Sequence, residues 1–121
     1  MDHAPAFLRL VEAARPHVRE LSVDEARARQ AAGARLLDVR EDGEWAAGHA
    51  AGAEHLGKGV IERDIETRAP DPNAELLLYC GGGYRSVLAA DTLQRMGYTN
   101  VASVAGGWRA WQEAGAPIAQ P

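Results

Sequence analysis

A single cysteine followed by three glycines is the part of this sequence most suited to chemistry. The segment consists of Cys80, Gly81, Gly82, Gly83, Tyr84, Arg85 and Ser86. Because glycine has no Cβ, a ligand can approach the backbone closely, and successive N–H groups can converge on one point. A helix that begins just after the loop would add its unpaired amides and partial positive charge. The segment therefore predicts a cradle for an anion that needs no lysine.

The anion that this loop could hold is the thiolate of Cys80 itself. In cysteine chemistry the thiolate, not the thiol, is the nucleophile. Individual charge-assisted hydrogen bonds contribute ~1.5–3 kcal/mol, so a few converging N–H groups would favour the charged form. Arg85, whose charge is permanent, could steady the thiolate or an incoming oxyanion. A lone cysteine at a strand end is usually a small buried hydrophobe, and it is the neighbouring glycines that favour a reactive Cys80.

The loop stands between a predicted strand and a predicted helix. Short apolar runs at 36–39, 76–79 and 101–104 are typical of strands buried on both faces of a parallel sheet. Apolar residues recur at helical spacing over 86–96, and Gly97 is the expected helix stop. A strand, a helix and a second strand in succession predict a parallel crossover. We therefore expect an α/β domain of three layers, with a mostly parallel central sheet, helices on both faces, and ligands at the carboxyl ends of the strands.

Three further helices are predicted. Apolar residues at helical spacing over 7–14 favour an N-terminal helix, and Trp108 to Ala114 favours a final one that ends at Gly115. Between them, Ser22 and Glu25 have the spacing of a capping box. We divide the chain into a helical extension at residues 1–19 and a domain at residues 20–121. The extension could pack on the domain or dock a partner.

Composition excludes several function classes. The chain has 121 residues, 13 basic and 17 acidic side chains, and a formal net charge of -4, so nucleic acid and anionic membranes are unexpected partners. No apolar run approaches the ~20 residues of a membrane span, and the first residues lack the pattern of a secretory signal. The single cysteine excludes an internal disulfide. A cytoplasmic location is therefore expected, and the sequence predicts no oligomeric state.

Four motifs, in order along the chain, resemble those of the rhodanese family of sulfurtransferases, and the resemblance runs from about residue 20 to residue 117. The motifs are Asp38-Val39-Arg40 with Glu41 and Glu44, Gly48-His49 with Gly52-Ala53, Cys80 through Arg85, and Gly106-Gly107-Trp108 with Trp111 and Gly115. The family often has isoleucine and proline after the histidine, where this chain has Ala50 and Ala51; this departure concerns packing.

The resemblance implies a rhodanese-like fold and a persulfide carried on Cys80. It implies that the loop residues 81–86 hold the substrate through their amides. Structural support is expected from Asp38, Arg40, His49, Gly106, Gly107 and Trp108. Asp38 and Arg40, which follow a buried strand, are expected to form a hydrogen-bonded pair that fixes the next loop.

The length of the cysteine loop distinguishes sulfur transfer from phosphate or arsenate chemistry, both of which occur within this fold. Arg85 is the sixth residue counting from Cys80, which gives Cys-x4-Arg. The related phosphatases and arsenate reductases are expected to use Cys-x5-Arg, a longer loop with room for a tetrahedral phosphate. The shorter loop favours the single terminal sulfur of a persulfide. Phosphatase or arsenate reductase activity is the less favoured alternative.

No metal or cofactor is expected. The four histidines, His3, His17, His49 and His55, have no spacing that would build a metal site with the one cysteine. The three consecutive glycines do not make the G-x-G-x-x-G pattern of dinucleotide binding.

The function expected from these observations is transfer of sulfane sulfur. Cys80 would take sulfur from a small donor such as thiosulfate and pass it to cyanide or a thiol acceptor. The alternative is a sulfur-relay or binding module that receives sulfur from a partner protein, docked by the N-terminal helix. Specificity would come from walls outside the loop glycines, with Tyr84, Lys58 and Trp108 as candidates.

Overall fold

The central sheet consists of five parallel strands in the order β1-β6-β5-β2-β4. The strands are β1 (Arg19–Leu21), β2 (Arg35–Asp38), β4 (Glu54–His55), β5 (Leu76–Tyr79) and β6 (Val101–Val104). The computed structural model describes residues 3–119, so the outermost residues of the two predicted segments, 1–2 and 120–121, lie outside it. Every residue of β5 and of β6 is buried, as the continuous apolar runs predicted.

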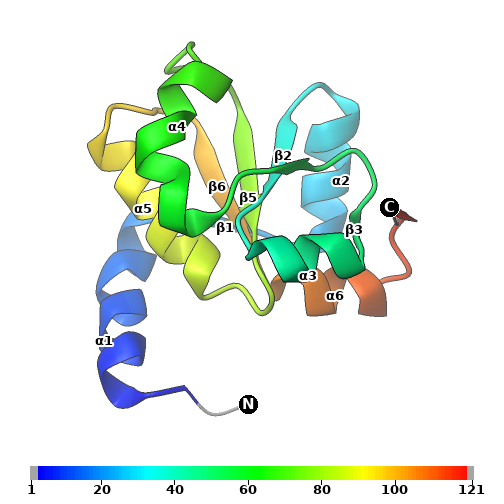
Figure 1. The fold of residues 1–121 in the computed structure, drawn as a ribbon, viewed down its shortest axis with the longest axis horizontal. Helices are drawn as coiled ribbons and strands as arrows, with labels where there is room; N and C mark the ends of the chain where they lie inside the picture. The colour runs from blue at the N-terminus through cyan, green and yellow to red at the C-terminus, as the bar shows by residue number, and fades with distance from the viewer. Residues whose placement is uncertain (1–2, 120–121) are drawn as a thin grey trace.

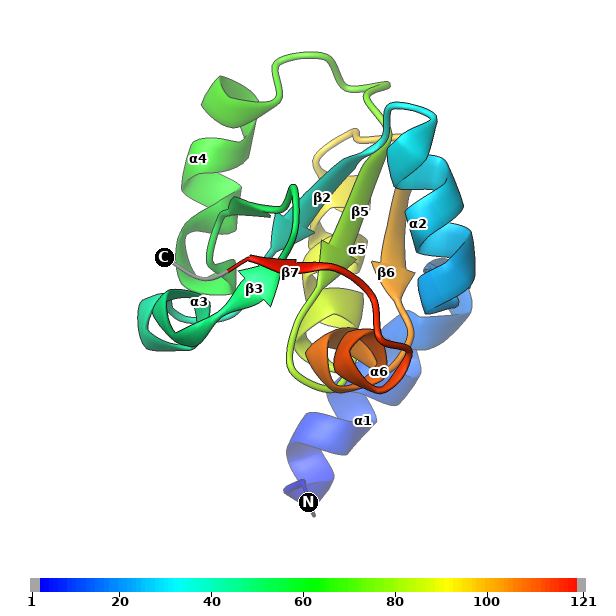
Figure 2. The same cartoon turned by 90° about the vertical axis from the view of Figure 1, so that its right-hand side faces the viewer.

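Helices cover both faces of the sheet (Figures 1 and 2). They are α1 (Pro5–Ala14), α2 (Val23–Ala31), α3 (Asp42–Ala47), α4 (Ile61–Arg68), α5 (Arg85–Arg95) and α6 (Gly107–Glu113), with 3-10 turns η1 (Arg15–His17) and η2 (Lys58–Val60). One core joins α1, α4 and α5 to Leu76 and Leu78, and the other joins α2 and α6 to Leu77 and Tyr79. Alternate side chains of β5 thus enter opposite cores, and the predicted three-layer α/β class is confirmed.

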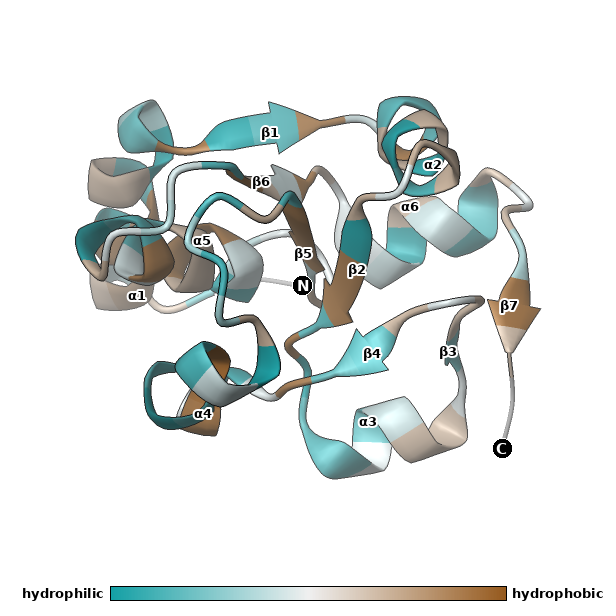
Figure 3. Ribbon diagram, turned by 90° about the horizontal axis from the view of Figure 1, so that it is seen from above, coloured by the Kyte–Doolittle hydropathy of each residue, from teal (hydrophilic) through white to brown (hydrophobic). Residues whose placement is uncertain are grey.

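Hydropathy follows this layering (Figure 3). Strands β2 and β5 are largely hydrophobic at the centre, whereas much of α3 and α4 is hydrophilic. Helix α4 buries Ile61 and Ile65, while Glu62 and Arg63 are exposed, so this helix has one apolar and one charged face.

Helix ends follow the predicted signals. The Ser22 hydroxyl accepts the Glu25 N–H at 3.1 Å, and the Glu25 carboxylate accepts the Ser22 N–H at 2.9 Å, which confirms the capping box. Gly97, after α5, has a φ of +106°, a conformation that favours glycine. Helices α5 and α6 each begin one residue before the predicted start.

The N-terminal helix packs on the domain. Helix α1 buries Val11 and Ala14 in the core it shares with α5. Strand β1, which begins at Arg19, pairs in parallel with β6. The division of the chain at residue 19 stays a prediction. None of the helices between residues 3 and 119 is long and apolar enough to cross a bilayer, and the cytoplasmic location stays a prediction as well.

Candidate active site

Cys80 follows β5 directly, and its sulfur faces main-chain amides. The Sγ atom accepts the N–H of Gly83 at 3.2 Å and the N–H of Ser86 at 3.3 Å. The Ser86 hydroxyl lies 3.5 Å from the same sulfur. Cys80 is only 1% exposed, but its sulfur points toward these dipoles and not into a purely apolar environment. This arrangement suits a sulfur that carries negative charge.

Helix α6 holds the other side of the loop through its first amides. The N–H of Trp108 donates to the Cys80 carbonyl at 2.7 Å, and the N–H of Arg109 donates to the Gly81 carbonyl at 3.1 Å. This close approach requires glycine at position 107, where φ is +52° and a Cβ would lie 2.2 Å from the Cys80 oxygen. Gly83 has a φ of +96°, and a Cβ there would lie 3.0 Å from the Gly106 nitrogen. The glycines are therefore needed where the loop and α6 meet.

Ser86 is fully buried and connects the sulfur to a second serine. Its hydroxyl lies 2.8 Å from the hydroxyl of Ser103 on β6. Because one hydroxyl can donate while the other accepts, this pair can direct the Ser86 proton toward Sγ. No local pattern selects Ser103, because 17 residues separate the two serines in the chain.

Arg85 pairs with a carboxylate and not with the sulfur. Its guanidinium binds Glu44 at two points, with distances of 2.9 and 3.1 Å. The Arg85 hydrogen bond holds the pKa of Glu44 below its ordinary value, and the same bond raises the pKa of Arg85. A Cβ on Gly81 would lie 3.2 Å from the Arg85 Nη2, so the ion pair covers one side of the loop. Glu44 already partners the charge of Arg85, and the expected role of Arg85 toward the thiolate or an incoming oxyanion stays a prediction.

Asp38 and Arg40 form the expected hydrogen-bonded pair. The Arg40 side chain donates to both Asp38 oxygens, the shortest distance being 2.7 Å, and also to the Gly48 carbonyl at 2.7 Å. The Tyr79 hydroxyl donates to Asp38 at 2.6 Å and accepts the Ala50 N–H at 3.0 Å. This buried network ties the ends of β2 and β5 to the segment that begins β3 (His49–Ala50), which pairs with β7 (Ile118–Ala119).

Trp45 packs against two of the histidines. The rings of Trp45 and His49 stack at 3.4 Å, and those of Trp45 and His55 at 5.0 Å. His49 bonds the Trp45 carbonyl and His55 bonds the Arg40 carbonyl. Since carbonyls only accept, each of these ring nitrogens carries a proton. Between residues 3 and 119, no three potential metal ligands of the His, Cys, Asp or Glu type lie together.

A pocket of about 520 Å³ lies beside the loop glycines. Its lining includes Gly81 and Gly82 from the loop, Tyr84 and Arg85 from its end, and Trp108 from α6. Two of the three expected walls, Tyr84 and Trp108, are therefore at this pocket. The guanidinium of Arg40 lies 4.8 Å from the ring of Trp108.

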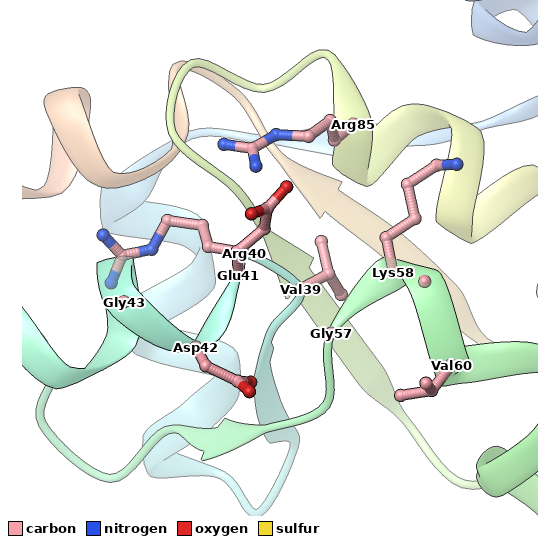
Figure 4. A pocket seen from close by; sticks show the side chains of 10 residues that line it. Val39, Arg40, Glu41, Asp42, Gly43, Gly57, Lys58, Val60 and Arg85 are labelled. Atoms are coloured by element: carbon pink, nitrogen blue, oxygen red, sulfur yellow. The ribbon is translucent and has the colours of Figure 1, made fainter.

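Lys58, the third expected wall, lies elsewhere. It lines a separate pocket with Arg40, Glu41 and Asp42, and Arg85 lines both pockets. Figure 4 shows the carboxylate of Glu41 directed toward Arg85, while Lys58 extends away from both. Lys58, on η2, is not among the residues that line the pocket beside the loop glycines, and its role as a wall stays a prediction.

Comparison with known families matches residues 22–114 to the rhodanese-like domain. The match includes the loop, the Asp38–Arg40 pair and the start of α6. The chain belongs to the rhodanese family. The thiosulfate sulfurtransferase GlpE of Pseudomonas entomophila is 36% identical over 94 residues, which are 78% of this chain and 84% of that protein. A putative sulfur carrier protein of Bacillus subtilis, YrkF, is 34% identical over 76 residues, 63% of this chain and 40% of that protein.

Solved structures of similar fold cover nearly the whole chain. A Rhodopseudomonas palustris protein of unknown function, described as a possible tyrosine phosphatase, has a TM-score of 0.83 and 30% identity, covering 98% of this chain and 99% of its own. The polysulfide-sulfur transferase homodimer of Wolinella succinogenes has a TM-score of 0.82 and 26% identity, covering 96% and 88%. The resemblance drawn from the four motifs is confirmed at the level of family and fold.

Two residues at this site make contacts that sequence reasoning did not predict. Glu44, on α3, was part of a motif but had no partner assigned, and it lies 41 residues from Arg85 in the chain. Tyr79 was expected only as a buried strand residue, yet its hydroxyl joins the Asp38 network. Both contacts depend on long-range packing. The one available signal was an acidic side chain, Glu44, that stands in a site motif without an assigned basic partner.

Proposed function

We propose that this rhodanese transfers sulfane sulfur through a persulfide on Cys80, with thiosulfate as one donor and cyanide or a thiol as acceptor. The observation that carries the proposal is the pair of amide N–H groups, from Gly83 and Ser86, that donate to the Cys80 sulfur. Charge-assisted hydrogen bonds of this kind favour a thiolate over a thiol.

In the first half-reaction the Cys80 thiolate attacks the outer sulfur of thiosulfate. A sulfur–sulfur bond forms to Cys80, the bond inside thiosulfate breaks, and its electron pair leaves with sulfite. In the second, the acceptor attacks the outer sulfur of the persulfide. The bond to Cys80 then breaks, the electron pair returns to Cys80, and cyanide leaves as thiocyanate or a thiolate as its persulfide. Such a double displacement gives ping-pong kinetics.

The loop holds further donors for the outer sulfur of the persulfide. Among the described residues, the N–H groups of Gly81, Gly82 and Tyr84 donate no hydrogen bond. We assign these amides to the terminal sulfur, since unpaired loop amides form anion-binding concavities. Cys80 is the only cysteine in the sequence, so an outside acceptor must relieve the persulfide.

Intact mass measurement tests the persulfide directly. The protein is incubated with thiosulfate, freed of small molecules and weighed, and we expect a gain of one sulfur atom. Cys80→Ala should show no gain, and Ser86→Ala, which keeps the cysteine and the backbone amides, should still gain sulfur. A gain that survives in Cys80→Ala, or the absence of any gain in the wild type, contradicts the proposal.

A relay role is the second candidate, and the similarity to a putative sulfur carrier protein favours it. In this case Cys80 would accept sulfur from a partner protein, and turnover of thiosulfate would be incidental. Steady-state thiocyanate formation separates the two functions. Efficient turnover with thiosulfate and cyanide supports the enzyme, whereas persulfide formation only in the presence of a protein donor supports the relay.

Phosphate ester hydrolysis is the less favoured alternative, although one similar structure is described as a possible tyrosine phosphatase. The Cys-x4-Arg loop is short, and Glu44 already occupies the guanidinium of Arg85, which a phosphoryl group would need. We expect no hydrolysis of a small aryl phosphate by the wild type. Hydrolysis that Cys80→Ser abolishes would contradict this expectation.

A further inference from the structure

His3 brings the N-terminal segment to the pocket beside the loop. It lines this pocket together with Gly81, Gly82 and Trp108. Its ring lies 4.4 Å from that of Tyr84, centroid to centroid. The match to the rhodanese-like domain begins at residue 22, so His3 precedes the matched residues.

Helix α1, which begins shortly after His3, is anchored in the core of the domain. Val11 is completely buried, and Ala14 is nearly so, in the core beneath α5. At the loop end of the helix, Phe7 lies 5.3 Å from the His3 ring and 6.3 Å from the Tyr84 ring. These spacings are typical of aromatic pairs, which contribute ~0.5–1.5 kcal/mol beyond burial alone. Phe7 of α1 therefore forms one aromatic cluster with His3 and the loop residue Tyr84.

The pocket is much larger than the small reactants considered so far. Its volume of about 520 Å³ is in the range of sites that bind whole small molecules, and thiosulfate or cyanide would fill only a small part. A bulky acceptor must instead pass the walls to reach the outer sulfur on Cys80. His3 forms one of these walls, and Gly81 and Gly82, which line the same pocket, have no side chains that could narrow the opening.

We propose that His3 is a specificity-determining residue, held in place by α1, that limits the size of the acceptor able to reach the Cys80 persulfide. This inference rests on the proposed function. It assigns the N-terminal segment a role in selecting the acceptor, while the sulfur chemistry stays with the loop.

Two acceptors of different size test the proposal, because in ping-pong kinetics the kcat/KM of the acceptor reports only its attack on the persulfide form. With thiosulfate as donor throughout, cyanide is the small probe and glutathione the large one. We expect His3→Trp to lower kcat/KM for glutathione about fivefold and His3→Ala to raise it about twofold. In both variants kcat/KM for cyanide should change less than twofold. Effects of this size are reasonable because pocket contacts commonly discriminate between substrates by ~10-fold or more.

Leu10 supplies the matched control. It lies on the same helix and is 62% exposed, but it lines a groove beside α5 and not the pocket by the loop. Leu10→Trp and Leu10→Ala should leave the glutathione-to-cyanide ratio unchanged. The proposal is overturned if both His3 variants keep the wild-type ratio, or if the Leu10 variants shift it equally.

Mass measurement after thiosulfate treatment separates failure of this inference from failure of the proposed function. If the wild type gains no sulfur, persulfide chemistry is wrong and the role of His3 falls with it. If the wild type and both His3 variants gain one sulfur, but the acceptor ratio does not move, only the inference about His3 is wrong. Thermal unfolding of each variant identifies any that fails to fold.

Discussion

Strands β2 and β5 run side by side with Asp38 opposite Tyr79, yet the segments that follow them are built in different ways. After β5, two main-chain amides donate to the Cys80 sulfur, and three of the loop residues are glycines. At the end of β2 the polar contacts are made by side chains, because Asp38, Arg40 and Tyr79 form a buried hydrogen-bonded network. The loop after β5 presents hydrogen-bond donors to a ligand, whereas the polar groups at the end of β2 bind one another.

This difference teaches where each region is vulnerable. A network of side chains is broken by removing atoms, because the buried partners are then left unsatisfied. A loop of backbone amides has few side chains to remove and is broken by adding atoms where glycine is required. We therefore expect mutations after β2 to reduce stability and mutations around the loop to reduce activity.

The largest effect is expected from Asp38→Ala. The substitution leaves the guanidinium of Arg40 buried without its carboxylate, which should lower the free energy of unfolding by about 3–5 kcal/mol. Asp38 is fully buried and Arg40 is 3% exposed, so water cannot readily replace the partner. Urea denaturation measures the loss. Glu66→Ala, at an exposed site on α4, should change stability by less than about 0.5 kcal/mol.

Gly107→Ala tests the loop side of the comparison. A Cβ at this position would lie 2.2 Å from the Cys80 carbonyl oxygen, so the loop or α6 must move. Since a misplacement of about 1 Å can cost about 100-fold in rate, we expect a loss of that order in kcat/KM for thiosulfate. Gly43→Ala, where no atom lies within 4 Å of the new Cβ, is the control and should retain activity. Wild-type kinetics in Gly107→Ala would show that the packing of α6 does not determine the conformation of the Cys80 loop.

Tyr79→Phe sharpens the comparison by removing one hydroxyl from the network. Both the Asp38 carboxylate and the Ala50 N–H lose a partner, so we expect a loss of about 1–3 kcal/mol in thermal or urea unfolding. Tyr98→Phe deletes a buried hydroxyl that bonds only the Ala69 carbonyl and should cost about 1 kcal/mol. Equal losses in the two variants would contradict a special contribution from the network.

The smallest effect concerns the pair that joins the two regions, Glu44 and Arg85. Because the folded-state pKa of Glu44 lies below its ordinary value of 4.5, the pair stabilises the protein above about pH 4.5 and loses its contribution as pH falls further. Glu44→Gln should therefore be less stable than the wild type at pH 6, by less than about 1 kcal/mol since both side chains are partly exposed. The difference should shrink by pH 3. A difference that grows with acidity would contradict the sign.

Sequence reasoning succeeded where a local pattern fixes a local structure. The apolar runs predicted β2, β5 and β6, and the glycines after Cys80 predicted a sulfur surrounded by amides. The short strands β3, β4 and β7 have two residues each, too few for a period, and they form only because distant segments supply their partners.

The long-range side-chain contacts of the site could not be predicted for the same reason, whereas the Asp38–Arg40 pair, two residues apart in the chain, could. The pairing of Arg85 with Glu44 and the approach of His3 to Tyr84 join residues that are far apart in the chain. Local spacing carries no information about such contacts, because the packing of whole helices decides them. The functional roles assigned to the individual site residues stay predictions until the variants are measured.

The two bonds from the start of α6 to the loop have a consequence for how sulfur is received. In a planar trans peptide the N–H points opposite to the carbonyl. By holding the carbonyls of Cys80 and Gly81, α6 turns the amides of the next two residues away from itself. The receptor for sulfur is thus rigid before any arrives, so crystals of the reduced and the sulfur-loaded protein should superimpose along this segment and differ by a single atom.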